Sequence, residues 1–328
     1  MLNVALIGAG RIGQIRADVI KRSSHARLVA VNDIDYGLAA GVEPGGLAST
    51  MEAILYGKHI DAVVIATPTK FHSEIAIRAL EASKHVLCEK PMGRNVTEAR
   101  AMYFAAEAAD RVLWAGFNYR EMAHVRFAKD FVDRGLLGKL HFFQCRFGHG
   151  GRPHYKEEWC TQKELSGGGV LIEQGIHIMD LVRHLFGEPY QVVAQTDCLF
   201  HDFKDTEDNA FCLLNTNRGL VQIHVSWTRW ENIFEIEIFG SKGFLRLEGR
   251  DGHYGPQKVI FGERQTDHSR PHEQKFDFPI KPDSWTLDWK AFELAIKTNT
   301  TNMYSGIRAQ ELVAAAYSSA KSNAWVNL

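Results

Sequence analysis

The N-terminal residues place a glycine-rich turn between a strand and a helix, and this order constrains the fold more than any other feature. The apolar run Leu2–Ile7 is typical of a buried strand, and it ends at the turn 8–13, which reads GAGRIG. A helical pattern follows, and a second apolar run, 28–31, ends at Asn32 and Asp33. Strand, glycine-rich turn, helix, strand and acid in this order predict a parallel α/β unit that binds a dinucleotide.

Each part of the turn has a mechanical task in such a site. Gly8 permits the tight turn, Gly10 lets the backbone approach a pyrophosphate, and Gly13 lets helix and strand pack closely. The helix begins at Arg11 and Ile12, and its free N–H groups face the phosphates, where the helix dipole also favours negative charge. The alternative is a glycine-rich turn that binds nothing. That alternative does not explain why Asp33 lies about twenty residues beyond Gly13, the distance typical of a dinucleotide site.

Asp33 indicates which nicotinamide cofactor binds. Its carboxylate can accept hydrogen bonds from the ribose hydroxyls of NAD, and it would repel the 2′-phosphate of NADP. The next residues, 34–37, contain no Arg or Lys that could attract this phosphate. The sequence therefore predicts NAD as the cofactor, with NADP less favoured.

The composition restricts the class of protein. The chain has 328 residues, enough for two domains, and its formal net charge of −1 gives no general attraction to nucleic acid or anionic membranes. No apolar run is long enough to span a bilayer, and the first strand begins so early that we expect no signal peptide. The 5 cysteines are scattered without zinc-type spacing, so we expect free thiols in a reducing cytoplasm.

Strands and helices alternate in the first part of the chain. After the first two strands, the expected elements follow at 60–66 (strand), 73–83 (helix), 85–88 (strand), 97–110 (helix) and 112–116 (strand). This alternation predicts a doubly wound parallel sheet covered on both faces, as in a Rossmann fold. We therefore expect a Rossmann NAD-binding domain over residues 1–120.

Strands dominate after about residue 120. The expected strands follow at 139–147, 191–200, 210–215, 220–229, 233–239 and 244–247. Helices are expected near 123–134, after the glycines 167–169, and near 287–298 and 305–322. The polar segment 249–271 reads as a surface excursion. The sequence thus predicts an α+β domain over residues 121–328 with a mainly antiparallel sheet.

Two loops carry polar residues where the parallel strands end. Thr67 and Pro68 follow one strand, and Glu89, Lys90 and Pro91 follow the next. Ligands of open α/β sheets bind at this edge. The ammonium of Lys90 could there bind a substrate hydroxyl and stabilise the alkoxide as hydride leaves. The alternative is a surface lysine that pairs with Glu89.

The helix after the glycines carries a second set of candidates. Glu173 and His177 lie four residues apart and share a face, and Asp180 follows. An imidazole can accept a hydroxyl proton, and a nearby carboxylate can orient the ring. The alternative is a satisfied core histidine. A metal site from these three residues lacks supporting Cys or His spacing, and we expect none.

The segment 149–155, HGGRPHY, is rich in glycine, basic and aromatic residues. Its Arg152 could bind an anionic substrate such as a phosphate or a nucleotide diphosphate. An ordinary polar loop is the alternative.

Three of these features occur together in one known family. They are the turn 8–13, the triplet 89–91 (EKP), and the three glycines before Glu173, His177 and Asp180. In this combination the chain resembles the glucose–fructose oxidoreductase / inositol dehydrogenase / rhizopine-catabolism (Gfo/Idh/MocA) family over essentially its whole length. Residues 66–68 with His72, and residues 116–118 with Arg120, also match the family pattern, whereas Tyr119 stands where the family frequently has Arg.

The resemblance implies hydride transfer between NAD and a secondary hydroxyl or ketone of a sugar, cyclitol or nucleotide sugar. It implies a catalytic pair of Lys90 and His177, with His177 as the general base, and substrate contacts from both. Glu173 stands where the family usually has Asp, and its longer side chain could still bind substrate or support His177. The positions implied to lie beside the cofactor are Thr67, Pro68, His72, Glu89, Lys90 and Asn118.

The same resemblance implies a large open sheet in the C-terminal domain that often forms the oligomer contact, as a homodimer or homotetramer. Two other functions remain open. Some relatives cleave glycosidic bonds with a recycled NAD cofactor. Others act as non-catalytic sensors, which would be expected to lose Lys90 and His177.

Overall fold

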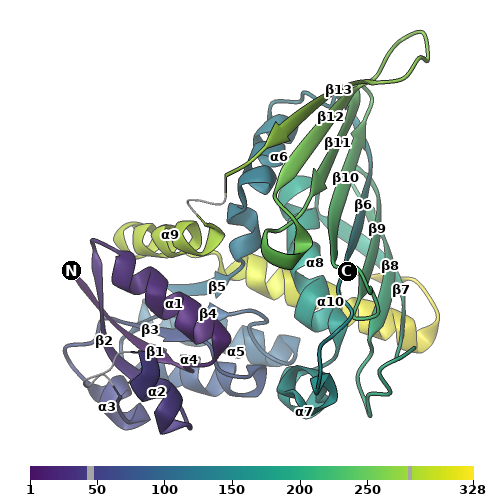
Figure 1. Ribbon diagram of the computed structural model, residues 1–328. Coiled ribbons are helices and arrows are strands. Elements are labelled where there is room, and N and C mark those ends of the chain that lie inside the picture. The colour runs from purple at the N-terminus through teal and green to yellow at the C-terminus, as the bar shows by residue number, and fades with distance from the viewer. Residues whose placement is uncertain (43–47, 280–282) are drawn as a thin grey trace. The chain divides into compact units, whose positions relative to one another are not determined.

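The computed structural model describes residues 1–42, 48–279 and 283–328 (Figure 1). Within these residues the chain forms two compact units, each with its own sheet. None of the helices in these ranges combines the length and the apolar character needed to cross a bilayer.

The first unit, Met1–Asn118 and Trp285–Ile307, contains a parallel five-stranded sheet with the order β2-β1-β3-β4-β5. Its strands are β1 (Leu2–Ile7), β2 (Ala26–Asn32), β3 (Ala62–Ile65), β4 (His85–Glu89) and β5 (Leu113–Gly116). Its helices are α1 (Arg11–Arg22), α2 (Tyr36–Val42), α3 (Met51–Tyr56), η1 (Thr69–Phe71), α4 (His72–Glu81), α5 (Val96–Ala109), α9 (Ser284–Thr298) and the start of α10 (Met303–Ser322). The expected Rossmann sheet is confirmed.

Helices cover both faces of this sheet, which explains why its strands are apolar on both sides. All four residues of β3 are buried. Val4, Leu6 and Val64 pack in one core cluster with residues of α1 and α9. Figure 1 shows α4 and α5 on the opposite face.

The strand order creates a switch point between β1 and β3. The chain runs outward from β1 to β2 and then returns to β3 on the other side of β1. The loops that follow β1 and β3 therefore diverge at the carboxyl edge, where open α/β sheets bind their ligands. The glycine-rich turn follows β1, and Thr67 and Pro68 follow β3.

The segment Trp285–Ile307 departs from the expected C-terminal domain, because it belongs to the first unit. Trp289 and Phe292 of α9 are buried in the core cluster that α1 also enters. Asp288 forms an ion pair with Arg16 of α1 at 2.8 Å. These contacts join parts of the chain that are far apart in sequence, so local periodicity could not indicate them.

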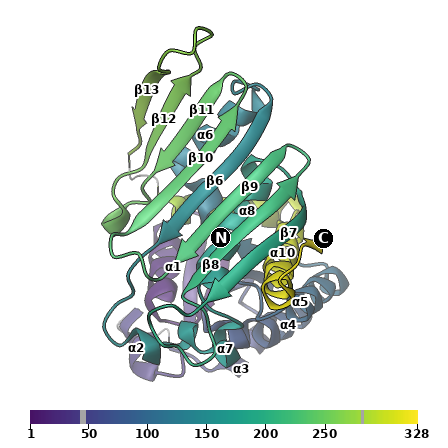
Figure 2. The same ribbon diagram turned by 90° about the vertical axis from the view of Figure 1, so that its right-hand side faces the viewer.

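The second unit, Tyr119–Ser284 and Arg308–Leu328, contains a nine-stranded sheet with the order β13-β12-β11-β10-β6-β9-β8-β7-β14 (Figure 2). Its strands are β6 (Leu140–Gly148), β7 (Pro189–Asp197), β8 (Asn209–Thr216), β9 (Gly219–Ser226), β10 (Ile233–Gly240), β11 (Gly243–Glu248), β12 (Lys258–Glu263), β13 (His272–Asp277) and β14 (Val326–Asn327). Neighbouring strands are antiparallel except β6 and β9. The expected large, mainly antiparallel sheet is confirmed.

The helical segments of this unit are short apart from the remainder of α10. They are η2 (Asn118–Glu121), which begins at the last residue of the first unit, α6 (Ala123–Asp133), η3 (Tyr155–Glu157), η4 (Trp159–Thr161), α7 (Lys163–Ser166), the π-helical η5 (Leu171–Gly175), α8 (Ile176–Leu185) and η6 (Gly252–Tyr254). The helix expected after the glycines is therefore divided, with a π-helical turn before α8.

The polar segment 249–271 was expected to be a surface excursion, and this expectation is wrong for residues 258–263. The strand β12 lies within it and pairs with β11. Val259 and Ile260, which are consecutive in this strand, are both buried. Its three apolar residues, 259–261, are consecutive and do not alternate with polar ones, so the period of a half-buried strand is missing from the sequence.

The two faces of the large sheet differ in their surroundings. Along β8, Cys212 and Leu214 are buried, whereas Phe211 and Leu213 are exposed. Phe142 and Leu220 on neighbouring strands are also exposed. Figure 2 shows this unit with α6 and α8 behind the sheet and no helix over the face toward the viewer.

Candidate active site

The glycine-rich turn has the close approaches that its sequence suggests. Gly8 has a φ of +94°, and a Cβ atom there would lie 2.6 Å from the backbone of Ala66. A Cβ atom on Gly13 would lie 1.9 Å from the carbonyl oxygen of Gly8. At Gly10 a Cβ atom would meet nothing within 4 Å. The turn thus packs tightly on the strands at two glycines and leaves open space at the third.

Asp33 joins the end of β2 to this turn. Its Oδ2 atom accepts a hydrogen bond from the backbone N–H of Ala9 at 2.6 Å, and its Oδ1 atom accepts one from Asp35 at 2.9 Å. Gly10 is the N-cap of α1 and provides no side-chain cap. The first N–H groups of α1, at Arg11 and Ile12, therefore suit the phosphates of a dinucleotide, so these residues fit NAD.

Glu89, at the end of β4, lies against a buried arginine. The guanidinium of Arg16 is fully buried, and its Nη2 atom lies 2.6 Å from Oε1 of Glu89. Burial raises the pKa of Glu89, and the positive charge of Arg16 opposes this rise. The Glu89 carboxylate is thus held by α1, whereas the resemblance had implied a place beside the cofactor. The positive charge of Lys90 also opposes the rise in the pKa of Glu89, so the alternative of a surface lysine paired with Glu89 stays open.

His72 connects the two loops at the carboxyl edge of the sheet. Its Nδ1 atom lies 2.8 Å from the carbonyl oxygen of Pro91, and its Nε2 atom lies 2.8 Å from that of Thr67. The ring is 1% exposed. Because both ring nitrogens face backbone carbonyls, the side chain braces the loops of Thr67 and Lys90, and a direct cofactor contact through these nitrogens is not available.

The remaining residues expected near the cofactor follow the ends of β3 and β5. The Thr67 hydroxyl donates to the carbonyl oxygen of Pro68 at 3.3 Å. Asn118 is 2% exposed, and it begins η2 two residues after β5. Their roles toward a cofactor remain predictions.

In the second unit, His177 lies near the start of α8 and is buried. Its ring stacks on that of Tyr119, with 3.7 Å between centroids and 5° between planes. Tyr119 in turn meets Phe147 and Phe234 edge to face. The imidazole orientation is therefore set by an aromatic cluster, and Glu173 lies in the π-helical turn before it.

Asp180 is held by Arg120 in a bidentate ion pair. The two nitrogen–oxygen distances are 2.7 and 2.5 Å. Since both carboxylate oxygens bind the guanidinium, Asp180 serves Arg120 and is not poised as a metal ligand. In the residues described, no group of three or more His, Cys, Asp or Glu side chains could hold a metal ion. All five cysteines are free thiols.

Glu173 lies close enough to Tyr155 and Cys160 for its charge to act on both. Burial and the Glu173 carboxylate together raise the pKa of the Cys160 thiol to about 12. The pKa of Tyr155 is also raised, mainly by burial. The loop that contains Tyr155 therefore lies near Glu173.

Arg152 lies on the same loop, but its charge is already matched. Its guanidinium hydrogen-bonds both carboxylate oxygens of Glu158 and lies 4.9 Å from the Tyr155 ring centroid. An anionic substrate would have to displace Glu158. The expectation that Arg152 binds an anion is thus weakened, and a substrate role for Arg152 remains a prediction.

Sequence reasoning gave too little weight to Tyr119 and missed Arg250. The guanidinium of Arg250 lies 4.4 Å from the ring centroid of Tyr254 and 5.2 Å from that of Tyr119. In the sequence Tyr119 stands out only as a departure from the family pattern, which gives no sign that its ring stacks on His177. Arg250 follows β11 in a segment without any motif, and only the folded sheet brings it to the Tyr119 ring.

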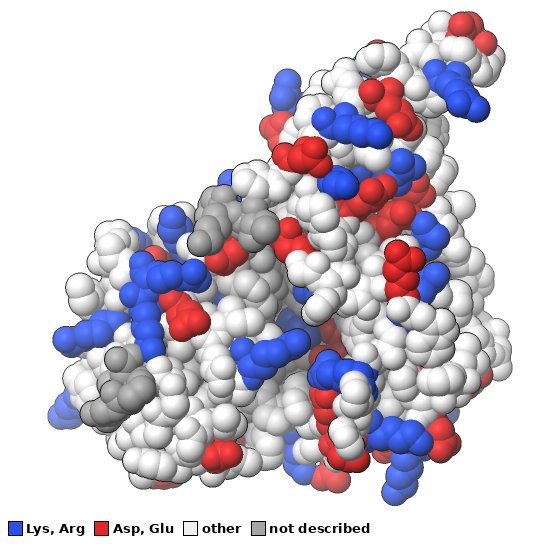
Figure 3. Space-filling view, in the orientation of Figure 1, with Lys and Arg blue, Asp and Glu red and all other residues white. Residues whose placement is uncertain are grey.

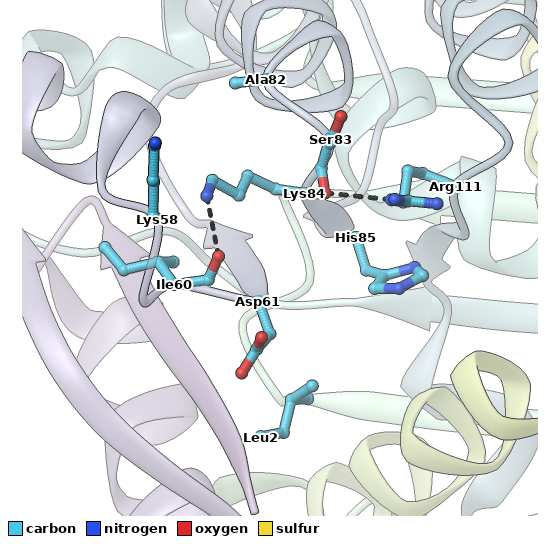
Figure 4. Close-up of a pocket in the computed structure, with 9 residues that line it drawn as sticks. All are labelled: Leu2, Lys58, Ile60, Asp61, Ala82, Ser83, Lys84, His85 and Arg111. Carbon is cyan, nitrogen blue, oxygen red and sulfur yellow. Dashed lines mark hydrogen bonds between the residues drawn. The ribbon is translucent and has the colours of Figure 1, made fainter.

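A separate cavity of about 520 Å³ opens at the amino edge of the Rossmann sheet (Figure 4). Leu2 and His85, which begin β1 and β4, line it, and Lys84 donates to the carbonyl oxygen of Ile60 at 2.8 Å. This is the edge opposite the glycine-rich turn, so the cavity is not the candidate site.

On the face in Figure 3, acidic and basic side chains are interspersed.

Two family models match the chain. The model described as oxidoreductase family, NAD-binding Rossmann fold, matches residues 2–117, and the GFO/IDH/MocA C-terminal domain matches residues 125–246. The two matches fall on the Rossmann sheet and on the large sheet.

Curated relatives and solved structures agree with these models. D-glucoside 3-dehydrogenase of Escherichia coli (strain K12) is 34% identical over 254 residues, which cover 72% of this chain and 71% of that protein. Myo-inositol 2-dehydrogenase of Thermotoga maritima is 25% identical over 331 residues, which cover 98% and 96%. A levoglucosan dehydrogenase solved in complex with NADH has a TM-score of 0.90 at 24% identity, covering 99% of this chain and 98% of that one, which shows a shared fold. The chain therefore belongs to the GFO/IDH/MocA family of NAD-binding oxidoreductases.

Proposed function

We propose that this protein transfers hydride between NAD and a secondary hydroxyl or ketone carbon of a sugar or cyclitol. The names of the glucoside and inositol dehydrogenases support this substrate class. The observation that carries the proposal is the dinucleotide-binding turn of the first unit, in which Gly8 and Gly13 pack tightly on the backbone and Gly10 leaves open space.

The cofactor would be held by the first unit. The N–H groups of Arg11 and Ile12 would bind the pyrophosphate, and Gly10 would let it approach. Asp33 would bind the ribose hydroxyls and disfavour a 2′-phosphate. When bound, NAD supplies the acceptor for the hydrogen of the carbinol carbon.

The chain's own residues would handle the proton and the oxygen. His177 takes the hydroxyl proton of the substrate, because a neutral imidazole is a suitable base near neutral pH. The ammonium of Lys90 hydrogen-bonds the same oxygen and stabilises the negative charge that develops there. Glu173 binds a neighbouring substrate hydroxyl. In the opposite direction His177 returns the proton to the ketone oxygen.

The Arg152–Glu158 pair bears on the choice among these substrates. Because Glu158 already neutralises Arg152, a nucleotide diphosphate gains little from this guanidinium. We therefore favour uncharged sugars and cyclitols over nucleotide sugars.

The first experiment is a spectroscopic assay of NADH formation. The purified protein is mixed with NAD and a panel of glycosides, free sugars, cyclitols, sugar phosphates and nucleotide sugars. We expect NADH with at least one uncharged compound, and a loss of at least about 100-fold in kcat for His177→Asn. Glycoside cleavage without net NADH would favour the hydrolytic alternative, and silence with confirmed NAD binding would favour a sensor.

We also propose that two copies of the chain associate through the open face of the large sheet. The exposed side chains Phe142, Phe211, Leu213 and Leu220 give this face the apolar surface that a stable dimer buries. Light scattering on the purified protein, and on a Leu220→Asp variant, tests this contact.

The free thiols and interspersed charges further support a cytoplasmic protein without nucleic-acid partners.

A further inference from the structure

The backbone and carboxylate of Glu207 occupy the start of the helical segment that carries Glu173 and His177. Its Oε2 atom accepts a hydrogen bond from the N–H of Gly169 at 3.0 Å, and its Oε1 atom accepts one from Leu171 at 2.9 Å. Its carbonyl oxygen accepts a third, from the residue between them, at 3.0 Å. One residue thus satisfies three successive N–H groups that have no partner inside a helix.

Tyr317 of α10 binds the same Glu207 carboxylate. Its hydroxyl donates to Oε1 of Glu207 at 2.8 Å. A Cβ atom on Gly168 would lie 2.1 Å from that hydroxyl oxygen, and one on Gly169 would lie 2.0 Å from the carbonyl oxygen of Glu207. Glycine is therefore required at both positions for Tyr317 and Glu207 to reach the start of the helix.

The turn that these contacts hold is π-helical. Leu171–Gly175 forms this turn and contains Glu173, whereas His177 lies beyond it in α8. Single π-helical turns are rare and occur frequently at functional sites. Their wider hydrogen bonding changes the angle between side chains before and after the turn. Relaxation to an α-helix would therefore rotate Glu173 relative to His177.

We infer that Glu207 and Tyr317 are positioning residues. They hold this turn so that the side chains of Glu173 and His177 contact the same substrate molecule. The inference rests on the proposed roles of those two side chains. Glu207 and Tyr317 themselves are expected to touch neither substrate nor cofactor. They act through the backbone of the helix start.

The charge of Glu207 suits this task. A carboxylate at a helix N-terminus is stabilised by the dipole and by the N–H groups it accepts. The Glu207→Gln variant keeps the size of the side chain but replaces one acceptor oxygen with an amide that can only donate. That amide would face an N–H of Gly169 or Leu171, so one of the two hydrogen bonds is lost.

The test compares Glu207→Gln and Tyr317→Phe with the wild type and with Glu157→Gln, which removes an exposed carboxylate in the same unit. Steady-state kinetics with the substrate found above gives kcat, KM and their pH profiles, and fluorescence titration gives the NAD affinity. Hydrogen exchange of the NAD-bound protein reports on the peptides that contain residues 169–177.

For Glu207→Gln we expect kcat to fall about tenfold or more, because small misplacements of reacting groups are costly. The pH profile of kcat/KM should change shape, exchange at 169–177 should accelerate, and NAD affinity should stay unchanged. Tyr317→Phe should show the same pattern more weakly, and Glu157→Gln should match the wild type.

Wild-type kcat, pH profile and exchange in Glu207→Gln would overturn the inference. Faster exchange throughout the second unit, with activity falling only in proportion to the folded fraction, would also overturn it. If the wild type yields no NADH with any compound, the proposed function fails. The exchange result then still decides whether Glu207 holds the turn.

Discussion

The imidazole ring of His177 lies flat on the phenol ring of Tyr119, with 3.7 Å between their centroids. Tyr119 is itself fixed by edge-to-face contacts with Phe147 and Phe234. A stacked ring restricts the imidazole to one plane without using either of its nitrogens. The stacking therefore orients the ring that we propose as the general base.

Replacing the phenol ring of Tyr119 should impair turnover more than cofactor binding. For Tyr119→Leu we expect kcat to fall about tenfold or more, because the imidazole loses its planar support. Tyr119→Phe keeps the ring and should stay within about threefold of the wild type. NAD affinity, measured by fluorescence titration, should be unchanged in both. Equal kcat values in the Leu and Phe variants would contradict an orienting role.

Lys90 should matter for chemistry and not for folding. Lys90→Met removes the ammonium but keeps an apolar side chain of similar length, so we expect kcat to fall by at least about 100-fold. Lys58→Met, in the same unit but at the opposite edge of the sheet, should retain wild-type kcat. Both variants should unfold at the wild-type temperature. Near-normal turnover of Lys90→Met would refute its assigned role.

The large features of the fold follow from local patterns, but the long-range contacts do not. Apolar runs broken by Gly and Pro predicted the parallel strands, because buried strands need apolar residues on both faces. The partner of Glu89 could not be found in this way. Arg16 lies on α1, far from β4 in sequence, and Asp288 is a second carboxylate on Arg16 from a segment near the end of the chain.

In the candidate site, too, local features could be predicted from the sequence and long-range contacts could not. Glu173 and His177 could be identified because their spacing and the preceding glycines are local features. The π-helical turn between the glycines and His177 could not, because it depends on Glu207 and Tyr317 from other parts of the second unit. Helical spacing alone therefore predicted a shared face, and tertiary contacts determine how the two side chains are turned.

The carboxylate of Asp33 should determine cofactor preference. We expect wild-type kcat/KM to favour NAD over NADP, since this carboxylate repels a 2′-phosphate. Asp33→Ser should lower kcat/KM for NAD. It should also reduce the ratio of kcat/KM for NAD to kcat/KM for NADP at least about tenfold. Asp35→Ser, which alters a neighbouring carboxylate, should leave the ratio near the wild-type value. A wild-type enzyme that uses both cofactors equally would contradict this reading of the site.

Arg16 should be important for stability. Its guanidinium is fully buried between Glu89 and Asp288, so Arg16→Met leaves two buried carboxylates without a counter-charge. Breaking a buried ion pair from one side costs about 3–5 kcal/mol. We expect Tm to fall by roughly 6 °C or more in a thermal melt. Arg134→Met, which removes an exposed pair with Asp130, should change Tm by no more than about 2 °C.

His124 should make the protein less stable as the pH falls. Burial lowers its pKa to about 4 in the folded protein, although hydrogen bonds of the imidazole to the Gly249 backbone and the Gln257 side chain oppose this shift. The unfolded chain regains a pKa of about 6.5. Between these two values the unfolded chain binds a proton that the folded protein does not, so stability rises with pH across this window and is lost on acidification.

The expected loss from His124 is about 1.4 kcal/mol per pH unit between pH 6 and pH 4, and roughly 3 kcal/mol in all. His124→Gln cannot bind this proton, so its Tm should fall less than the wild-type Tm when the pH is lowered from 7 to 5. His253→Gln removes an exposed histidine of the same unit and should follow the wild-type curve. Parallel curves for the wild type and His124→Gln would mean that His124 is protonated as readily in the folded protein as in the unfolded chain.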